Sequence, residues 1–423
     1  MNIEKLYEIF LNHFSVQTDT RKLKIGDIFF ALKGPNFNGN TFAGKALESG
    51  ASWVVADEET GIHDSRIFMV PDALDALQKL ASFHRDHFKI PFIAITGSNG
   101  KTTTKELIHA VLSSHFKTYT TTGNLNNHIG IPLTILKIKS DAEMAVIEMG
   151  ASHMREIASY CTYAKPNFGM ITNIGKAHLE GFGGPENVKK GKGELFDYLR
   201  EHGGCAFVNA DDPNVKSLGE NLKNKVSFGS TCQPPTGKLI QSDPYLIAEL
   251  ANSDVQISTH IVGSYNLPNV LAAVTIGRYF NVPEEKIRTA IESYIPSNSR
   301  SQMIEKNGCH IIMDAYNANP GSMCAAIENF AAMKADHKIL VLGDMKELGE
   351  YSQKEHAAII DLIKKYQWAG VFLTGPEFAK VPHPYHQFET SEDAAKWIHE
   401  HPWSNAYVLV KGSRSMAMEK ALN

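Results

Sequence analysis

Cysteine is scarce in this chain, and the patterns of membrane-spanning and exported proteins are missing. The 423 residues include five cysteines, an odd number without a C-x-x-C pair, which excludes a disulfide scaffold and argues against a zinc site. No apolar run approaches the roughly 18 residues of a membrane helix, and the amino terminus carries early acidic residues in place of a basic export signal. We therefore expect a cytoplasmic protein with reduced thiols and no membrane span. The cysteines are Cys161, Cys205, Cys232, Cys309 and Cys324.

An excess of positive charge is also missing. The chain has 42 Lys and Arg against 46 Asp and Glu, a net charge of −4, and no basic block stands out, so nucleic acid is not an expected ligand. Hydrophobic residues make up 43% and charged residues 21%, which is typical of globular proteins. At roughly 150 residues per domain, the length suggests about three domains.

Apolar strand-like runs alternate with helical patterns, which predicts a parallel α/β architecture. Phe92–Ile95 leads into a glycine-rich turn and then a helix, and Ile339–Leu342 repeats this arrangement near the end of the chain. Ser352–Glu355 resembles a capping box before a further helix. The apolar positions of the two helices are Leu107, Ile108, Val111 and Leu112, and Ile359, Ile360 and Ile363.

Two interruptions of this pattern predict domain boundaries. The first is the charged stretch at residues 84–90, and the second is the polar stretch 296–299. The segment 233–237 is also loop-like, but strand patterns flank it, so it is interpreted as an internal loop. The resulting domains are residues 1–86, 87–296 and 297–423.

The strongest local motif is Thr96–Thr102, with the sequence TGSNGKT between a strand and a helix. Glycines allow backbone N–H groups to close around phosphate, the lysine reaches the outer phosphates, and the Thr102 hydroxyl can bind Mg²⁺. A full Walker A motif needs glycine where this chain has Ile95, which weakens the interpretation as a generic P-loop GTPase or kinase. An ordinary tight turn is the alternative, but the order of strand, glycines, Lys-Thr and helix favours a nucleoside triphosphate site.

Two further residues follow predicted strands. Glu148 follows Met144–Ile147, and His178 comes shortly after Phe168–Ile171. Because the carboxyl ends of parallel strands meet at one edge of a sheet, both side chains could reach a metal ion beside the triphosphate. The alternatives are a helix cap for the acid and a structural role for the histidine.

These motifs together resemble those of the ATP-dependent Mur ligases in order and spacing. The phosphate motif is followed by Asn124–Pro132, Glu148–Gly150 and Asn173–Gly183. Asp19–Arg21 with Gly26–Leu32 resembles the UDP-sugar-binding amino-terminal domain, and Gly263–Asn269 resembles the adenine-binding segment. The resemblance implies a central P-loop-type, parallel-sheet ATPase domain with a small amino-terminal UDP-substrate domain and a Rossmann-like carboxy-terminal domain.

The later motifs are similar to one branch of that family. Asp314–Met323, Leu342–Met345 with Glu347–Gly349, and Lys411–Ser415 resemble the enzymes that join D-alanyl-D-alanine to UDP-N-acetylmuramoyl-tripeptide through an acyl phosphate. The D-N-P-R signature of the sister ligase that adds a diamino acid does not occur. One departure is Asn38-Gly39-Asn40, where the family often has Asp-Gly-His, which puts a uridine or pyrophosphate contact at that position in doubt.

The resemblance implies roles for individual residues. Lys101, His178, Lys192 and Arg300 would be catalytic, and Lys192 matches a lysine that the family carbamylates. The ATP-binding residues would be Gly97, Ser98, Asn99, Gly100, Lys101, Thr102, Thr103, Asn266, Asn269, Arg300 and Asp314. Mg²⁺ would be held by Thr102, Glu148, His178 and carbamylated Lys192. Substrate contacts would come from Thr20, Arg21, Asn126, Asn317, Asn319, Ser322 and Arg414.

Other interpretations of Lys192 and of the function of the chain remain open at this point. Lys192 follows Lys189 and Lys190, so a solvated lysine is the simple alternative. The chain could also be the diamino-acid ligase, a folylpolyglutamate synthase or an ATP-binding switch without ligase activity. The favoured reading predicts a monomeric cytoplasmic ligase of peptidoglycan precursor synthesis, and hence a part in cell shape and division. Its active site would lie in a cleft that closes by domain rotation.

Overall fold

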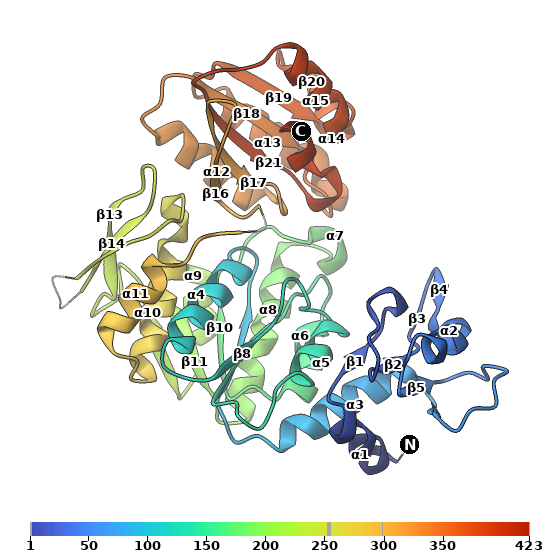
Figure 1. Cartoon of the computed structure of the whole chain (residues 1–423). Helices are drawn as coiled ribbons and strands as arrows, with labels where there is room; N and C mark the ends of the chain where they lie inside the picture. Colours follow the sequence, from blue (N-terminus) through green and yellow to red (C-terminus); the bar gives the residue numbers. More distant parts are fainter. Residues whose placement is uncertain (1, 252–254, 298, 423) are drawn as a thin grey trace.

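The computed structural model describes residues 2–251, 255–297 and 299–422. It confirms an α/β chain with the three-domain architecture: the amino-terminal domain lies beside the central domain, and the carboxy-terminal domain lies over one end of the central sheet (Figure 1). Residue 298, in the polar stretch expected at the second boundary, lies outside the described residues. Within these ranges the five cysteines are free, and no helix is long and apolar enough to cross a membrane.

The amino-terminal domain is built on a parallel sheet in the order β1-β2-β5-β6. Its last helix, α3, also packs on helices of the central domain. The Arg85 guanidinium donates to the carbonyls of Ala164 (3.1 Å) and Lys165 (3.0 Å) and lies 3.7 Å from the centroid of the Phe92 ring. The sequence pattern therefore changes near residue 86, but the amino-terminal and central domains still pack against each other there. The elements are α1 (Ile3–His13), β1 (Val16–Gln17), β2 (Ile28–Phe30), β3 (Lys33–Gly34), β4 (Phe37–Asn38), α2 (Ala43–Glu48), β5 (Trp53–Ala56), β6 (Ile67–Met69) and α3 (Ala73–Asp86).

The central domain has a parallel sheet in the order β12-β11-β10-β7-β9-β8 between two helical layers. Alternate residues of β7 face opposite layers: Ile93 and Ile95 pack with α4, α10 and α11, whereas Phe92 and Ala94 face α5, α6 and α8. The chain crosses to the other side of β7 after β9, so a ligand crevice is expected at the carboxyl end of β7. The strands are β7 (Phe92–Thr96), β8 (Thr118–Thr120), β9 (Met144–Glu148), β10 (Phe168–Ile171), β11 (Cys205–Asn209) and β12 (Lys225–Phe228), and the helices are α4 (Lys101–Ser113), α5 (Gly130–Ile135), α6 (Glu156–Ala164), α7 (Leu179–Phe182), α8 (Pro185–Glu201), α9 (Pro213–Gly219), α10 (Leu267–Tyr279) and α11 (Glu284–Glu292).

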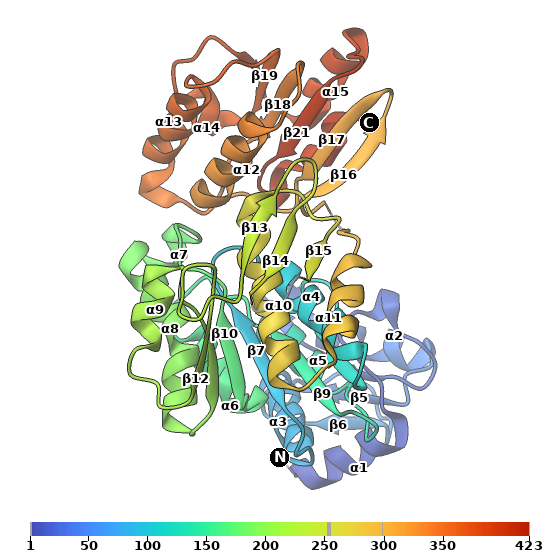
Figure 2. The same ribbon diagram turned by 90° about the vertical axis from the view of Figure 1, so that its left-hand side faces the viewer.

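A small antiparallel sheet follows β12, in the order β13-β14-β15 (Figure 2). Its strands are β13 (Gly237–Gln241), β14 (Ile247–Leu250) and β15 (Gln256–Ser258). The segment 233–237 connects β12 to β13, as the internal-loop interpretation predicts.

The carboxy-terminal domain has a sheet in the order β16-β17-β21-β18-β19-β20, parallel except for the edge strand β16. Helices α12 and α13 cover one face and α15 covers the other. After β18, the buried carboxylate of Asp344 accepts backbone N–H groups of Glu377 and Phe378, both at 3.0 Å, and fixes the start of α14. The elements are β16 (Gln302–Lys306), β17 (Cys309–Asp314), α12 (Pro320–Ala332), β18 (Lys338–Gly343), α13 (Ser352–Ile363), β19 (Gly370–Thr374), α14 (Pro376–Ala379), β20 (His386–Phe388), α15 (Ser391–Glu400) and β21 (Tyr407–Lys411).

The capping box predicted at Ser352–Glu355 is wrong. A 3-10 turn, η4 (Gly349–Tyr351), runs directly into α13, so Ser352 already has helical backbone angles and cannot act as an extended cap. The Glu355 carboxylate instead pairs with Lys176 of the central domain at 2.5 Å. Capping boxes of this kind occur at the starts of α12 and α15.

Candidate active site

The loop between β7 and α4 has a backbone that only glycine can adopt at two positions. Gly97 has φ 141° and Gly100 has φ 77°. A Cβ atom at Gly97 would lie 2.0 Å from Thr172 Oγ1, and one at Gly100 would lie 2.9 Å from Asn269 Oδ1. The loop ends at the N-terminus of α4, where free backbone N–H groups and the helix dipole favour an anion.

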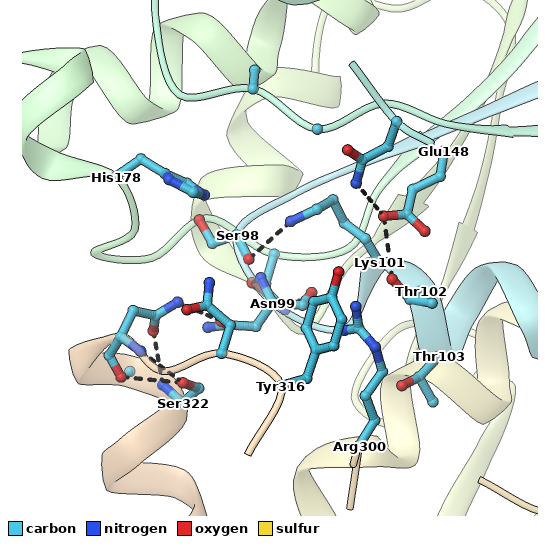
Figure 3. Close-up of a pocket in the computed structure, with 18 of the residues that line it drawn as sticks. Ser98, Asn99, Lys101, Thr102, Thr103, Glu148, His178, Arg300, Tyr316 and Ser322 are labelled. Atoms are coloured by element: carbon cyan, nitrogen blue, oxygen red, sulfur yellow. Dashed lines mark hydrogen bonds between the residues drawn. The ribbon is translucent and has the colours of Figure 1, made fainter. Parts of the chain in front are cut away.

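Lys101, the first residue of α4, lies over this loop (Figure 3). Its amino group donates to the carbonyls of Gly97 (2.8 Å) and Ser98 (3.1 Å). Burial lowers the pKa of Lys101; the charge of Glu148 opposes this effect, and the charge of Arg300 adds to it. A bound polyphosphate would supply the negative charge that this environment favours.

Glu148, at the end of β9, has the features of a metal ligand. Its side chain is buried; Oε1 accepts hydrogen bonds from Thr102 Oγ1 (3.2 Å) and Asn126 Nδ2 (2.7 Å). Among the described residues, no group donates to the buried Oε2 atom. An unpaired buried carboxylate oxygen beside a threonine hydroxyl suits Mg²⁺. Asn126, predicted to contact substrate, therefore also orients this carboxylate.

The described residues contain no cluster of three His, Cys, Asp or Glu side chains that could hold a metal alone. This agrees with Mg²⁺ chemistry, because the ion commonly keeps several waters and takes one or two protein ligands beside substrate phosphates.

Lys192 lies on α8 and is completely buried, so the solvated-lysine alternative is wrong. Its amino group donates to the Ala151 carbonyl at 2.7 Å and lies 5.2 Å from the centroid of the Phe182 ring. Burial lowers its pKa far below the usual value, and the charge of Lys101 lowers it further. The side chain is therefore suited to being a neutral amine.

Asn266 and Asn269 link α4, the helix that follows the phosphate loop, to α10. Asn266 Nδ2 donates to the Val262 carbonyl (2.8 Å), Asn269 Nδ2 donates to Asn266 Oδ1 (2.7 Å), and the Thr104 hydroxyl donates to Asn269 Oδ1 (2.9 Å). Both asparagines are buried and line the cavity described below. They therefore brace α4 in addition to any contact with a nucleotide.

The carboxy-terminal domain supplies the opposite wall. The Arg300 guanidinium lies 3.6 Å from the centroid of the Tyr316 ring, a cation–π stack. The Asp314 carboxylate pairs with Lys411 Nζ at 2.5 Å and accepts the backbone N–H of Ser301 at 3.1 Å. Tyr316 and Lys411 belong to quoted motifs, but no role was predicted for them.

Polar contacts hold this wall against the central domain. Asn319 Nδ2 donates to Asn99 Oδ1 at 2.7 Å, and the His178 imidazole contacts the Glu347 carboxylate. Bonding to His178 lowers the pKa of Glu347. Within its own domain, Asn319 forms a capping box with Ser322 at the start of α12, so both predicted substrate residues also have a structural role.

One cavity of about 570 Å³ lies between the two domains. Most predicted site residues line it, together with Tyr265, Asn173 and Glu347, for which no role was predicted. The predicted residues in the lining are Ser98, Asn99, Gly100, Lys101, Thr102, Thr103, Asn126, Glu148, His178, Asn266, Asn269, Arg300, Asp314, Asn317, Asn319 and Ser322.

Other predicted residues lie outside this lining. Arg414 is exposed and pairs with Glu419 at 2.8 Å. Thr20 and Arg21 lie in a 3-10 turn of the amino-terminal domain, where Arg21 pairs with Asp19 at 2.8 Å. Lys192 and Gly97 lie behind the lining, next to residues that belong to it.

Asn40, which stands where the family often has histidine, forms hydrogen bonds within the amino-terminal domain. The Asn40 side chain is buried, donates to Asp57 Oδ1 at 2.8 Å and accepts the Asp57 backbone N–H at 3.1 Å. Both ends of its amide group are therefore used within the amino-terminal domain.

Known proteins resemble this chain along nearly its whole length. Residues 95–277 match the Mur ligase middle domain, and residues 299–414 match the Mur ligase, glutamate ligase domain. The UDP-N-acetylmuramoyl-tripeptide--D-alanyl-D-alanine ligase of Bacillus subtilis is 33% identical over 96% of this chain and 91% of its own length. The chain belongs to the Mur ligase family.

Solved structures of related Mur ligases have the same three-domain fold. MurF from Acinetobacter baumannii has a TM-score of 0.86 at 28% identity, covering 96% of this chain and 92% of its own. MurF from Thermotoga maritima, in complex with ADP, has a TM-score of 0.85 at 29% identity and covers 96% of both chains. Ligases named for the addition of D-alanyl-D-alanine are therefore among the sequence relatives of this Mur ligase, and MurF proteins are among its structural relatives.

Proposed function

We propose that the protein uses ATP to join D-alanyl-D-alanine to UDP-N-acetylmuramoyl-tripeptide in cytoplasmic peptidoglycan precursor synthesis. The observation that carries this proposal is the interdomain cavity, in which a phosphate-binding loop faces Arg300, Asp314 and Asn317 of another domain. Full-length relatives named for this reaction support the same substrates. The motifs of the carboxy-terminal domain favour this reaction over the addition of a diamino acid.

The chemistry requires the conversion of a poor leaving group into a good one. The tripeptide carboxylate would attack the γ-phosphorus of ATP, forming an acyl phosphate and releasing ADP. The dipeptide amine would then attack the acyl carbon, lose a proton and expel inorganic phosphate. Catalysis of such a phosphoryl transfer depends on positioning and on neutralising charge.

The residues described above fit these tasks. Lys101 and the N-terminus of α4 would bind the outer phosphates, and Arg300, oriented by Tyr316, would approach the γ-phosphate from the carboxy-terminal domain. Asp314 would contact the ribose. Thr102, Glu148 and His178 would hold Mg²⁺, which supplies charge neutralisation to the triphosphate when bound.

Lys192 would act as its carbamate. Its burial and its lowered pKa favour the neutral amine that attacks CO₂, and the adduct is an anion able to bind Mg²⁺. We assign residues 87–296 to ATP, residues 1–86, with Thr20 and Arg21, to the UDP end of the first substrate, and residues 297–423 to D-alanyl-D-alanine. Arg414 stays a candidate for the dipeptide carboxylate.

The test is an incubation with ATP, Mg²⁺ and UDP-N-acetylmuramoyl-tripeptide, with either D-alanyl-D-alanine or free diamino acid, followed by mass spectrometry. Tripeptides ending in lysine and in diaminopimelate are both used, because the sequence does not identify the third residue. We expect a product extended by the dipeptide alone. Extension by the diamino acid, or ATP binding without any product, would contradict the proposal.

The carbamate has a separate test. Lys192→Ala should lose most activity but bind ATP normally, and acetate or formate should restore part of the rate by occupying the vacated anion site. Lys192→Arg keeps the positive charge and cannot form the adduct, so it should be inactive. Full activity of Lys192→Arg, or rescue by small amines instead of carboxylates, would show that the residue acts as a cation.

A further inference from the structure

Glu347 reaches the active site from a motif of the carboxy-terminal domain that the proposed function leaves without a role. It follows β18 in a tight loop and has a left-handed backbone, with φ 62°. Its neighbours Met345 and Leu348 are buried, and the Met345 N–H donates to His356 Nε2 at 3.1 Å. The protein thus presents Glu347 on a rigidly anchored loop.

The loop and the following helix α13 dock on one short segment of the central domain, the loop at two points and the helix at one. The Glu347 carboxylate contacts His178 Nδ1, and the Glu347 carbonyl accepts the Glu180 N–H at 3.1 Å. Two residues before His178, Lys176 pairs with the buried carboxylate of Glu355 at 2.5 Å. The carboxy-terminal domain therefore supplies partners for the side chains of Lys176 and His178 and for the backbone N–H of Glu180.

The chemistry of a ligating histidine explains why a carboxylate is useful here. A histidine that binds a metal through one ring nitrogen commonly donates its other N–H to a carboxylate, which fixes the tautomer and the orientation of the ring. A carboxylate that accepts a hydrogen bond from Nδ1 keeps the hydrogen on that atom and leaves Nε2 as the lone-pair donor. The Glu347 side chain is 57% exposed, and exposed charged contacts contribute little to folding. Stability alone therefore gives little reason for this contact.

We propose that Glu347 is a positioning residue for His178: it is delivered by the carboxy-terminal domain, and it sets the tautomer and orientation of the imidazole when the two domains meet. This inference rests on the proposed function, in which His178 helps to hold Mg²⁺. The orientation of His178, a proposed Mg²⁺-binding residue of the central domain, would then depend on docking of the carboxy-terminal domain, which is proposed to bind the second substrate.

The test compares Glu347→Gln with Glu350→Gln, a matched control that removes the same charge three residues away at an exposed position of the same loop. Ring-nitrogen NMR spectra of ¹⁵N-histidine-labelled full-length proteins, with His178→Gln to assign the signal, report the tautomer with ADP and Mg²⁺ present. Ligase assays give kcat, the KM for ATP and the Mg²⁺ concentration for half-maximal rate. Thermal melting shows whether each variant is folded.

We expect His178 to be protonated on Nδ1 in the wild type and in Glu350→Gln, and to become a mixture of tautomers in Glu347→Gln. The kcat of Glu347→Gln should fall about 10- to 100-fold with a raised Mg²⁺ requirement, while its KM for ATP and its melting temperature change little. An unchanged His178 spectrum, or equal kcat in the two variants, would overturn the inference while leaving the ligase activity of the wild type in place. A wild type that makes no product would refute the proposed function, and the NMR comparison would still decide the role of Glu347.

Discussion

Replacing Lys192 by methionine separates the contribution of this side chain to the reaction from its contribution to the fold. Methionine has a similar length and would keep the apolar contact with Phe182, but it loses the 2.7 Å hydrogen bond to the Ala151 carbonyl. The change leaves the carbonyl of buried Ala151 without its donor, which costs about 1–3 kcal/mol, and a sulfur–aromatic contact returns about 0.3–1.5 kcal/mol. Above the usual pKa of lysine, near 10.4, the variant should therefore be less stable than the wild type by no more than about 3 kcal/mol.

At lower pH the variant should become the more stable protein. Burial lowers the pKa of folded Lys192, so below pH ~10.4 the unfolded chain binds a proton that the folded chain does not. Stability rises with pH where the unfolded state binds more protons. As the pH falls from the unfolded to the folded pKa value, the free energy of unfolding of the wild type should therefore decrease by about 1.4 kcal/mol per pH unit. That of Lys192→Met should not show this decrease.

The assay is urea unfolding of both proteins, followed by far-ultraviolet circular dichroism at several pH values in buffers free of CO₂. Bicarbonate should then raise the unfolding midpoint of the wild type only, because the adduct forms in the folded protein. Lys192→Met should make no ligation product at any pH. Parallel stability curves for the two proteins would show that folded Lys192 stays protonated, which would refute the argument from burial.

Further predictions concern the loop, the arginine and the carboxy-terminal domain. Lys101→Ala should reduce turnover at least 100-fold with an unchanged melting temperature, because its charge serves phosphate and not a core; near-normal turnover would remove the nucleotide-site assignment. Arg300→Lys loses the stack on Tyr316 and should lower kcat/KM for ATP about 3- to 30-fold, as steady-state kinetics would measure. Asp344→Asn replaces one acceptor oxygen by an NH₂ donor, so one of the two backbone N–H groups loses its partner, and the domain should be destabilised by about 2–4 kcal/mol, measured by urea unfolding with tryptophan fluorescence; a smaller change than 1 kcal/mol would contradict this role.

The phosphate loop could be predicted from the sequence because its determinants are contiguous: the glycines, Lys101 and Thr102 all lie between one strand and one helix. The positions of Glu148 and Asp314 at the ends of strands could also be predicted, because an apolar strand-like run precedes each residue. The contacts of Tyr316 and Glu347 could not be predicted: Tyr316 meets Arg300 through the folding of the carboxy-terminal domain, and Glu347 meets His178 only where that domain docks on the central one. Local patterns also mislead where tertiary contacts compete.

Glu355 illustrates the last point. Its spacing from Ser352 fits a helix cap, but a lysine on another domain takes its carboxylate. Asn40 is a different case, because the sequence already put a ligand contact at its position in doubt, and its amide group bonds to the side chain and the backbone of Asp57.

The packing of α3 on the central domain has a consequence for how such chains can be recombined. Arg85 and its carbonyl partners at residues 164 and 165 tie the amino-terminal domain into the helical layer below the central sheet. An amino-terminal domain exchanged between relatives would therefore need the matching α5 and α6 surfaces. The interface between the central and carboxy-terminal domains includes individual hydrogen-bonded pairs such as Asn99 with Asn319. A few substitutions could restore such pairs in an exchanged domain. Evolution could thus replace the carboxy-terminal domain more easily than the amino-terminal domain.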